Sequence, residues 1–246
     1  MSQPLRVGIV SQARMGSTRL PGKVLREAGG NSLLGWHLAR LRQTGLPVYL
    51  ATTTLPEDDV LADFARRHHL PCLRGSAPDV LARYHAAAAA FGLDIIIRVT
   101  SDCPLIAPEL LREGLADYLA AADPNLYLSN AAPHRSYPRG FDYEIFSRQL
   151  LDEAHAQATQ PADREHVTPY LHQNRTGQTH FLNPTRALGD RSAYRLTVDV
   201  PEDFTLVKRL LEDHDAGHLS GEALIALLDA HPELVALNAH VEQKKT

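Results

Sequence analysis

The sequence predicts an α/β protein with a Rossmann-like, mainly parallel sheet. Short apolar runs alternate with helical patterns through the first half of the chain, which is the rhythm of βαβ units. One of these runs, Asp94 to Thr100, is almost continuously apolar, as expected for a strand buried on both faces. The chain has 246 residues, of which 44% are hydrophobic, so it can bury a sizeable core within a single domain spanning 1–246.

The first part of the chain supplies most of the predicted elements. Strands are expected where β-branched or aliphatic residues cluster, and helices where apolar residues recur every three or four positions. The expected order is a strand at Leu5–Val10, a helix at Leu33–Arg42, a strand at Val48–Thr52, a helix at Glu57–His68, a short strand near Cys72, an alanine-rich helix at Val80–Phe91 and the strand Asp94–Thr100.

The later part is less regular. A helix opening at Pro108 and ending near Ala121, and a strand at Asn125–Ser129, continue the pattern. Residues 130–189 contain five prolines and many turn residues, which predicts an inserted subregion with a hairpin and helices, acting as an acceptor-side lid or dimer arm. A strand at Tyr194–Val200 and a helix starting at Pro201 should complete the sheet. The tail is expected to be helical from Ser220, interrupted at Pro232, with frayed ends at 242–246.

Charge and composition exclude several classes of protein. The formal net charge of −4 argues against a general binder of nucleic acid or membrane surfaces. Neither a signal-peptide pattern nor an apolar stretch of membrane-spanning length is visible, which predicts a cytoplasmic location. Cys72 and Cys103 form no C-x-x-C pair and are expected to be structural thiols. The thirteen histidines show no metal-ligand spacing and are expected to be structural.

The segment Ser11–Lys23, SQARMGSTRLPGK, follows the first predicted strand and carries the most chemistry. It combines Arg14, Arg19 and Lys23 with Gly16 and Gly22. Glycines let backbone N–H groups approach an anion closely, and three neighbouring cations repel one another unless an anion offsets their charge. A nucleoside triphosphate would supply that charge.

Two other interpretations of this loop are less favourable. A phosphate-loop NTPase needs four residues between the glycines and a Ser or Thr after the lysine, whereas five residues separate Gly16 from Gly22 and Val24 follows Lys23. A merely solvated basic loop is the simpler alternative. The mixture of glycine, proline and cations at the carboxyl end of a strand favours an anion-binding function.

Two aspartates follow predicted strands. Asp102 lies in RVTSDCPLI, after the buried strand, and Asp199 lies in RLTVDVPED. If both strands are parallel, the two carboxylates emerge at the same edge of the sheet and could share one Mg²⁺, which commonly takes one or two carboxylates plus substrate phosphates. Each aspartate alone is better explained as a helix cap or turn residue, and only the pair together with the basic loop indicates a metal site.

An ordered set of motifs resembles the CMP-sugar synthetase superfamily of acylneuraminate- and KDO-type cytidylyltransferases. The set extends from Val7 to about Leu210 and is most similar to the spore coat polysaccharide branch. It consists of QARMGSTRLPGK, GSAPDVLARY, RVTSDCPLI, YPRGFDYEIF, REHVTPY and LTVDVPEDF.

The resemblance implies a nucleotide-diphospho-sugar transferase fold, CTP as a substrate and a homodimer. It implies catalytic roles for Arg14, Lys23, Asp102 and Asp199, with Mg²⁺ held by the two aspartates. The implied nucleotide-binding residues are Ala13, Arg14, Gly16, Arg19, Lys23, Ser76 and Thr100.

Recognition of a small, sugar-like and possibly acidic acceptor is expected in the inserted subregion. The candidates are Arg139, Asp142, Glu144, Arg164, Glu165 and His166. Arg139 or Arg164 could bind a carboxylate bidentately, but a structural salt bridge of Arg164 with Asp142 or Glu144 is an equally good explanation. His166 could orient or relay a proton, or simply fill a helix face.

The leading hypothesis is therefore a cytidylyltransferase that transfers CMP from CTP to such an acceptor and releases pyrophosphate for surface polysaccharide biosynthesis. The alternatives are a glycosyltransferase that uses a nucleotide-sugar donor, and a non-catalytic nucleotide-binding protein. A glycosyltransferase of related fold usually carries Asp-x-Asp at its metal site, whereas Ser101-Asp102-Cys103 offers one carboxylate. The retained Lys23, Asp102 and Asp199 argue against loss of catalysis.

Overall fold

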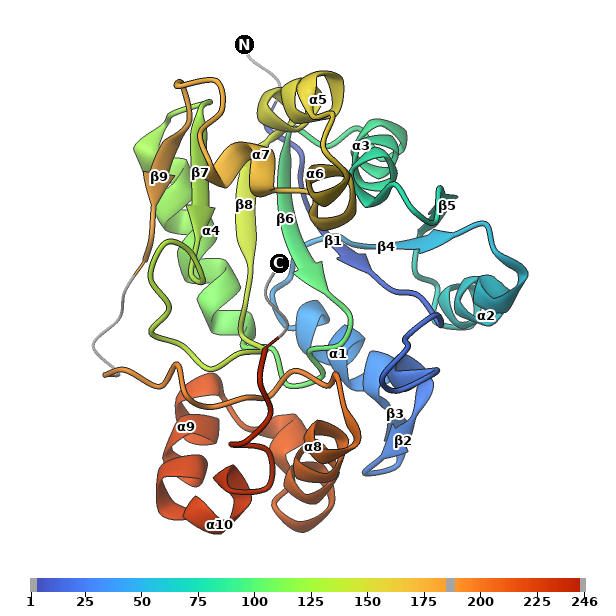
Figure 1. Cartoon of the computed structure of the whole chain (residues 1–246), viewed down its shortest axis with the longest axis vertical. Coiled ribbons are helices and arrows are strands. Elements are labelled where there is room, and N and C mark those ends of the chain that lie inside the picture. The colour runs from blue at the N-terminus through green and yellow to red at the C-terminus, as the bar shows by residue number, and fades with distance from the viewer. Residues whose placement is uncertain (1–3, 185–188, 244–246) are drawn as a thin grey trace.

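The centre of the protein is a seven-stranded sheet with the order β5-β4-β1-β6-β8-β7-β9 (Figure 1). The computed structural model describes residues 4–184 and 189–243. Strand β8 runs antiparallel to both neighbours, and the other neighbouring pairs are parallel, so the predicted mainly parallel α/β sheet is confirmed. The strands are β1 (Val7–Gln12), β4 (Val48–Thr53), β5 (Cys72–Gly75), β6 (Ile95–Thr100), β7 (Leu126–Ser129), β8 (Glu144–Ser147) and β9 (His180–Leu182).

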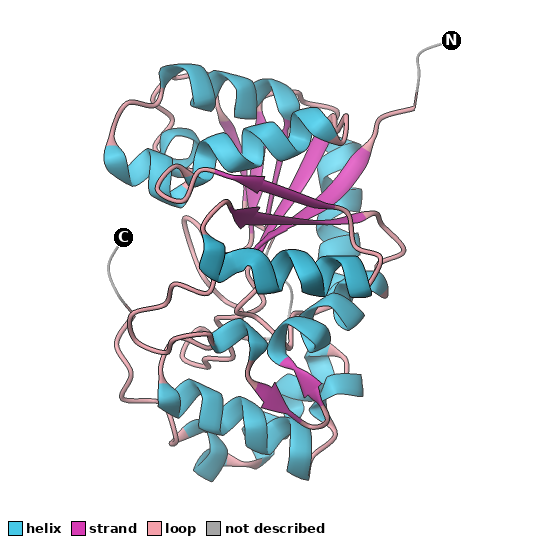
Figure 2. Cartoon of the chain, turned by 90° about the vertical axis from the view of Figure 1, so that its right-hand side faces the viewer, coloured by secondary structure: helices cyan, strands magenta, loops and turns pink. Residues whose placement is uncertain are grey.

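Helices cover both faces of this sheet (Figure 2). Successive strand residues point to opposite faces, so Ile9 joins one buried cluster while Val10 joins the other. The first cluster includes side chains of α1 (Leu33–Arg42), α2 (Asp59–Arg67) and α4 (Pro108–Ala121). The second includes side chains of α3 (Val80–Ala90), α5 (Arg148–Gln157) and α7 (Pro169–His172), together with Val167 directly after α6 (Pro161–His166).

Local signals fix several helix starts where the sequence predicts them. The Ser32 hydroxyl accepts the Gly35 N–H at 3.0 Å, and Asp79 accepts the Ala82 N–H at 2.8 Å, so α1 and α3 begin at capped positions. Pro108 occupies the first turn of α4, where its missing N–H costs no hydrogen bond. The bounds predicted for α1 and α4 are confirmed.

The C-terminal helices lie beneath the carboxyl edge of the sheet, in the lower part of Figure 1. They are α8 (Pro201–Asp213), α9 (Gly221–Ala230) and α10 (Pro232–Val235), and buried leucines of all three join the α1 and α4 cluster. Helix α8 also contacts the short hairpin formed by β2 (Glu27–Ala28) and β3 (Asn31–Ser32). Three short 3₁₀ helices complete the described elements: η1 (Lys23–Leu25), η2 (Pro56–Asp58) and η3 (Ala216–His218).

The predicted strand at Tyr194–Val200 is wrong. Leu196 and Val198 are fully buried on either side of the less buried Thr197, but among the described residues the β pairing of this segment is limited to an isolated parallel bridge between Arg139 and Arg195. The alternation from Leu196 to Val198 reflects an extended chain that passes the carboxyl edge of the sheet and has no neighbouring strand in the described part of the protein. Hydrophobic periodicity reports burial on one side and does not show whether a ladder partner exists.

Residues 130–189 also differ from the expectation. No hairpin forms within the described part of this range; β8 and β9 instead join the central sheet on either side of β7. The expected helices are present as α5, α6 and α7. Residues 185–188 of the predicted subregion and 244–246 of the predicted frayed tail lie outside the described residues.

Candidate active site

A cavity of about 400 Å³ opens at the carboxyl edge of the sheet, where β1 and β6 lie side by side. From β1 the chain continues to β4 and β5 on one side, whereas β6 leads toward the other side. The loops after β1 and β6 therefore diverge at a topological switch point, where open α/β sheets bind ligands. Gln12 is in register with Thr100, so both loops start at the same level.

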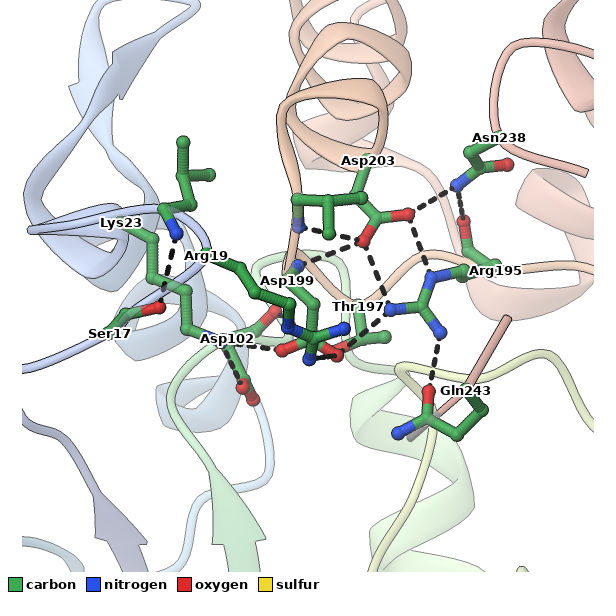
Figure 3. A network of polar contacts seen from close by, with 12 residues as sticks. Ser17, Arg19, Lys23, Asp102, Arg195, Thr197, Asp199, Asp203, Asn238 and Gln243 are labelled. Carbon is green, nitrogen blue, oxygen red and sulfur yellow. Dashed lines mark hydrogen bonds and ion pairs between the residues drawn. The ribbon is translucent and has the colours of Figure 1, made fainter. Parts of the chain in front are cut away.

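The loop after β1 is held in place by two contacts that position Lys23. The Met15 N–H donates to the buried Asp58 carboxylate at 2.6 Å, and the Gly22 N–H donates to the Met15 carbonyl at 3.2 Å. Gly22 has φ 65°, a left-handed conformation that favours glycine. The loop thus folds back on itself, and the Lys23 side chain points toward the carboxylates of the other segments (Figure 3).

Lys23 joins the two aspartates that the sequence singled out. Its Nζ lies 2.8 Å from Asp102 Oδ2 and 2.8 Å from Asp199 Oδ1. Burial lowers the pKa of Lys23, but attraction to Asp102 and Asp199 raises it above its usual value. Burial raises the pKa of Asp102, but attraction to Lys23 and hydrogen bonding outweigh burial and leave that pKa at about 2. Lys23 and Asp102 are therefore both charged at neutral pH.

Asp199 reaches this point although it does not follow a strand. The Val198 N–H donates to the Asp102 carbonyl at 2.8 Å, which ties the two acidic segments together. Gly140 permits the approach of the neighbouring chain, because a Cβ at this position would lie 2.7 Å from the Leu196 carbonyl carbon. The expected proximity of Asp102 and Asp199 is thus observed, by a route that differs from the predicted parallel strands.

Two arginines also contact Asp199. Arg19 Nη2 lies 3.2 Å from Asp199 Oδ2, and Arg195 Nη2 lies 2.9 Å from the same oxygen (Figure 3). Arg19 is partly exposed at the cavity, whereas Arg195 is buried behind it. Asp199 consequently faces cations on both the cavity side and the protein side.

Most of the predicted nucleotide-binding residues line the cavity. They are Ala13, Arg14, Gly16, Arg19, Lys23 and Thr100. Within the described chain, the Arg14 side chain forms no hydrogen bond or ion pair, so its charge is available for a ligand. Ser76 does not line the cavity; its hydroxyl accepts the Asp79 N–H at 3.2 Å in the turn before α3.

The predicted acceptor residues divide into two groups. Arg139, Asp142, Glu165 and His166 line the cavity. Glu144 and Arg164 do not line it; Glu144 pairs with Arg98, and Arg164 pairs with Asp79 at 2.9 Å. Asp142 pairs with Arg135. The structural alternative for Arg164 therefore has Asp79 as its partner instead of Asp142 or Glu144.

Several residues around the site were not predicted from the sequence. Asp58 anchors the first loop, while Arg195, Asp203, Asn238 and Gln243 form a network behind Asp199. The motif containing Asp199 includes Arg195 and Asp203, so their position was a usable signal. Asn238 and Gln243 carry no comparable signal, since they lie in an ordinary C-terminal segment.

The acidic pair fits a magnesium ion in its donor chemistry. Two carboxylate oxygens, one from Asp102 and one from Asp199, converge on a single cationic atom, Lys23 Nζ. Among residues 4–184 and 189–243, no group of three or more His, Cys, Asp or Glu side chains is arranged to hold a metal. The pair thus resembles a site in which a ligand's phosphates supply the remaining oxygens.

The fold and this cationic and acidic cavity define the class of protein: a nucleotidyltransferase of the α/β type. A sequence model described as cytidylyltransferase matches residues 7–231, so the chain belongs to the cytidylyltransferase family.

Individual relatives and solved structures are consistent with this family assignment. The chain is 34% identical over 234 residues to the spore coat polysaccharide biosynthesis protein SpsF of Bacillus subtilis, covering 91% of this chain and 94% of that protein. It resembles the structure of a cytidylyltransferase from Leptospira borgpetersenii with a TM-score of 0.89 at 33% identity, covering 99% of this chain and all of the other. A CMP:2-keto-3-deoxy-manno-octonic acid synthetase complexed with CTP shares the fold, with a TM-score of 0.56 at 19% identity over 85% of this chain and 99% of that one.

These findings confirm the resemblance and the enzyme class expected from the sequence. The protein is a CTP-dependent nucleotidyltransferase, which disfavours both the glycosyltransferase and the non-catalytic alternatives. Within the described part of the chain, none of the helices has both the length and the apolar character that crossing a bilayer requires.

Proposed function

We propose that this enzyme transfers CMP from CTP to a small, sugar-like and possibly acidic acceptor, with Mg²⁺, for surface polysaccharide biosynthesis. The observation that carries the proposal is the position of Lys23 between Asp102 and Asp199 in the lining of the cavity, which Arg14 and Arg19 also line. This arrangement provides positive charge for a triphosphate and an acidic pair for its metal ion.

The cations have separate tasks in this proposal. Arg14 is free of polar partners within the described chain and binds the phosphates directly. Lys23 and Arg19 neutralise the aspartates in the ligand-free protein and turn toward the triphosphate when it binds. Negative charge accumulates on the leaving pyrophosphate, and preorganised cations in a partly closed cavity stabilise that charge.

Asp102 and Asp199 would hold the magnesium ion. When bound, the ion would polarise the phosphate oxygens and offset their charge. The bond that forms joins an acceptor oxygen to the α-phosphorus, and the bond that breaks joins the α-phosphorus to the oxygen bridging to the β-phosphate. The acceptor hydroxyl loses its proton and pyrophosphate leaves.

The acceptor binds on the side of the cavity formed by Arg139, Asp142, Glu165 and His166. The Arg139 side chain forms no hydrogen bond or ion pair within the described residues, and burial lowers its pKa. A partly buried guanidinium without a partner favours an anionic group, and arginine binds carboxylates bidentately. An acidic sugar satisfies this side of the cavity best.

The direct test is pyrophosphate release with each of the four ribonucleoside triphosphates, Mg²⁺ and a panel of neutral sugars, acidic sugars and sugar phosphates. Release that requires CTP, an acceptor and Mg²⁺ supports the proposal. Equal rates with and without an acceptor, or full activity in the presence of a chelator, would contradict it. The expected homodimer and cytoplasmic location remain predictions, testable by sedimentation and cell fractionation.

A further inference from the structure

A buried polar network lies behind Asp199 (Figure 3). Asp203 is fully buried and accepts hydrogen bonds on both carboxylate oxygens. Its Oδ1 accepts from Arg195 Nε and from Asn238 Nδ2, each at 2.8 Å. Its Oδ2 accepts from the backbone N–H of Asp199 at 2.9 Å, from that of Val200 at 3.2 Å and from Arg195 Nη2 at 3.1 Å.

Arg195 connects this carboxylate to Asp199. Its Nη2 donates to Asp199 Oδ2 at 2.9 Å as well as to Asp203, so one guanidinium nitrogen bridges the two aspartates. Asp203 thus fixes the Asp199 backbone directly and its side chain through Arg195. The remaining oxygen of Asp199, Oδ1, faces Lys23.

The C-terminal segment completes the network. Asn238 is buried, and its amide donates both to Asp203 and to the Arg195 carbonyl, the latter at 3.0 Å. Arg195 Nη1 donates to Gln243 Oε1, and Gln243 itself lines the cavity. A segment about 40 positions beyond Asp199 in the sequence therefore restrains the group on which Asp199 depends.

We propose that Arg195 and Asp203 are positioning residues: through them, the C-terminal segment at Asn238 and Gln243 orients Asp199 so that its Oδ1 faces the nucleotide. The proposal rests on the function assigned above to Asp199. Partners that orient a ligating carboxylate typically change metal affinity or activity by about 10- to 100-fold when replaced. The network differs from a simple buried ion pair because the same nitrogen serves both carboxylates.

The test compares Asp203→Asn, Arg195→Lys and Asn238→Ala with the wild type. Every described partner of the Asp203 carboxylate is a donor, so an asparagine NH₂ must face a donor and disturb Asp199. Lysine keeps the charge of Arg195 but loses the fork that serves two carboxylates. We expect kcat to fall about 10- to 100-fold in the first two variants, and less in Asn238→Ala. The KM for CTP should change far less.

A second readout separates positioning from folding. Mn²⁺ binding to the CTP complex, followed by electron paramagnetic resonance, should weaken in the three variants in the same order as kcat. Asp229→Asn is the matched control, because Asp229 pairs bidentately with Arg191 in the same part of the chain without contacting Asp199. This control should retain wild-type kcat and Mn²⁺ binding.

Two outcomes overturn the inference in distinguishable ways. If the folded Asp203→Asn, Arg195→Lys and Asn238→Ala proteins keep wild-type kcat and Mn²⁺ binding while Asp199→Asn is inactive, the network is merely structural. If Asp199→Asn itself keeps wild-type turnover, the proposed function of Asp199 fails, and the positioning role fails with it. Unfolding temperatures measured for every variant identify any variant that is not folded and must be left out of the comparison. Asn238→Ala perturbs the network least and keeps the test available if the other variants do not fold.

Discussion

Replacing Lys23 with methionine tests how strongly this side chain holds the acidic pair. Methionine keeps most of the aliphatic stem and removes the charge that lies 2.8 Å from both aspartates. The pKa of Asp102 is about 2 against a usual value of 3.8, a difference of nearly two units. At 1.36 kcal/mol per unit, this difference corresponds to about 2 kcal/mol of folding free energy. The Asp102 side chain is only 23% exposed, so solvent screening removes little of it.

The pH dependence of this stabilisation follows from the lowered pKa of Asp102. Because the pKa of Asp102 is lower in the folded state, its stabilisation is complete above the unfolded value of 3.8 and is lost as the pH falls toward 2. At pH 7 the wild type retains all of it. Lys23→Met should therefore lower the free energy of unfolding by about 2 kcal/mol at pH 7, or Tm by roughly 4 to 8 °C for a chain of this size.

Thermal unfolding followed by circular dichroism measures this loss of stability. Repeating it with and without millimolar Mg²⁺ at constant ionic strength tests whether the two carboxylates bind a metal ion. Without Lys23 the two carboxylates are open to a metal ion, so Mg²⁺ should restore part of the lost Tm in the variant and have little effect on the wild type. Lys208→Met is the control, because Lys208 lies 3.9 Å from Glu212 in an exposed pair that contributes little. An unchanged Tm in Lys23→Met would refute the charge pairing, and a lowered Tm that neither Mg²⁺ nor Mg²⁺ with CTP raises would refute the metal site.

The remaining predictions address the reaction, the acceptor and pH. Asp102→Asn and Asp199→Asn should each slow CTP-dependent pyrophosphate release at least about 100-fold, equivalent to roughly 3 kcal/mol, with a native circular dichroism spectrum; wild-type rates would exclude both from the metal site. Arg139→Met should raise the KM for an acidic acceptor at least about tenfold while leaving the KM for CTP nearly unchanged; equal changes in both would show that Arg139 serves the nucleotide. Burial, together with Arg40, lowers the pKa of His37 from 6.5 to about 4 despite the opposing effects of the Cys103 carbonyl and Asp102. Its stabilisation is complete above pH 6.5 and is lost toward pH 4, costing about 3 kcal/mol, so denaturant unfolding of His37→Gln should show a flatter pH dependence over this window, and parallel curves would contradict the assignment.

The sequence alone was sufficient to predict the elements whose boundaries depend on residues a few positions apart. Helices α1 and α4 begin where Ser32 caps the chain and where Pro108 fits the first turn, and both features act within a few residues. The buried strand β6 was recognisable because three consecutive isoleucines suit a strand covered on both faces. The cationic loop before Lys23 was equally recognisable, since its glycines and charges are adjacent in sequence.

Pairings between distant segments were not predictable in the same way. The partner of Arg164 is Asp79, 85 positions away, and the partner of Glu144 is Arg98, 46 positions away. Any acidic residue on a nearby element was an equally reasonable partner for Arg164 until the packing of α6 against α3 was known. Residue type therefore predicted that these side chains would be charged partners, whereas only the fold determined which of them would face the cavity.

Asp199 shows why a residue's position can be predicted correctly from an element that does not form. Its expected position near Asp102 rested on a strand that does not form, but the alternating burial of Leu196 and Val198 still identified an extended segment passing the carboxyl edge of the sheet. What periodicity could not supply was the means of holding an extended segment without a ladder. The structure supplies it through isolated backbone hydrogen bonds to Asp102 and Arg139. It adds the hydrogen bonds that Arg195 and Asp203 donate to or accept from Asp199. Because these bonds end on the side chain and backbone of Asp199, the support of the segment and the orientation of the carboxylate are one physical feature.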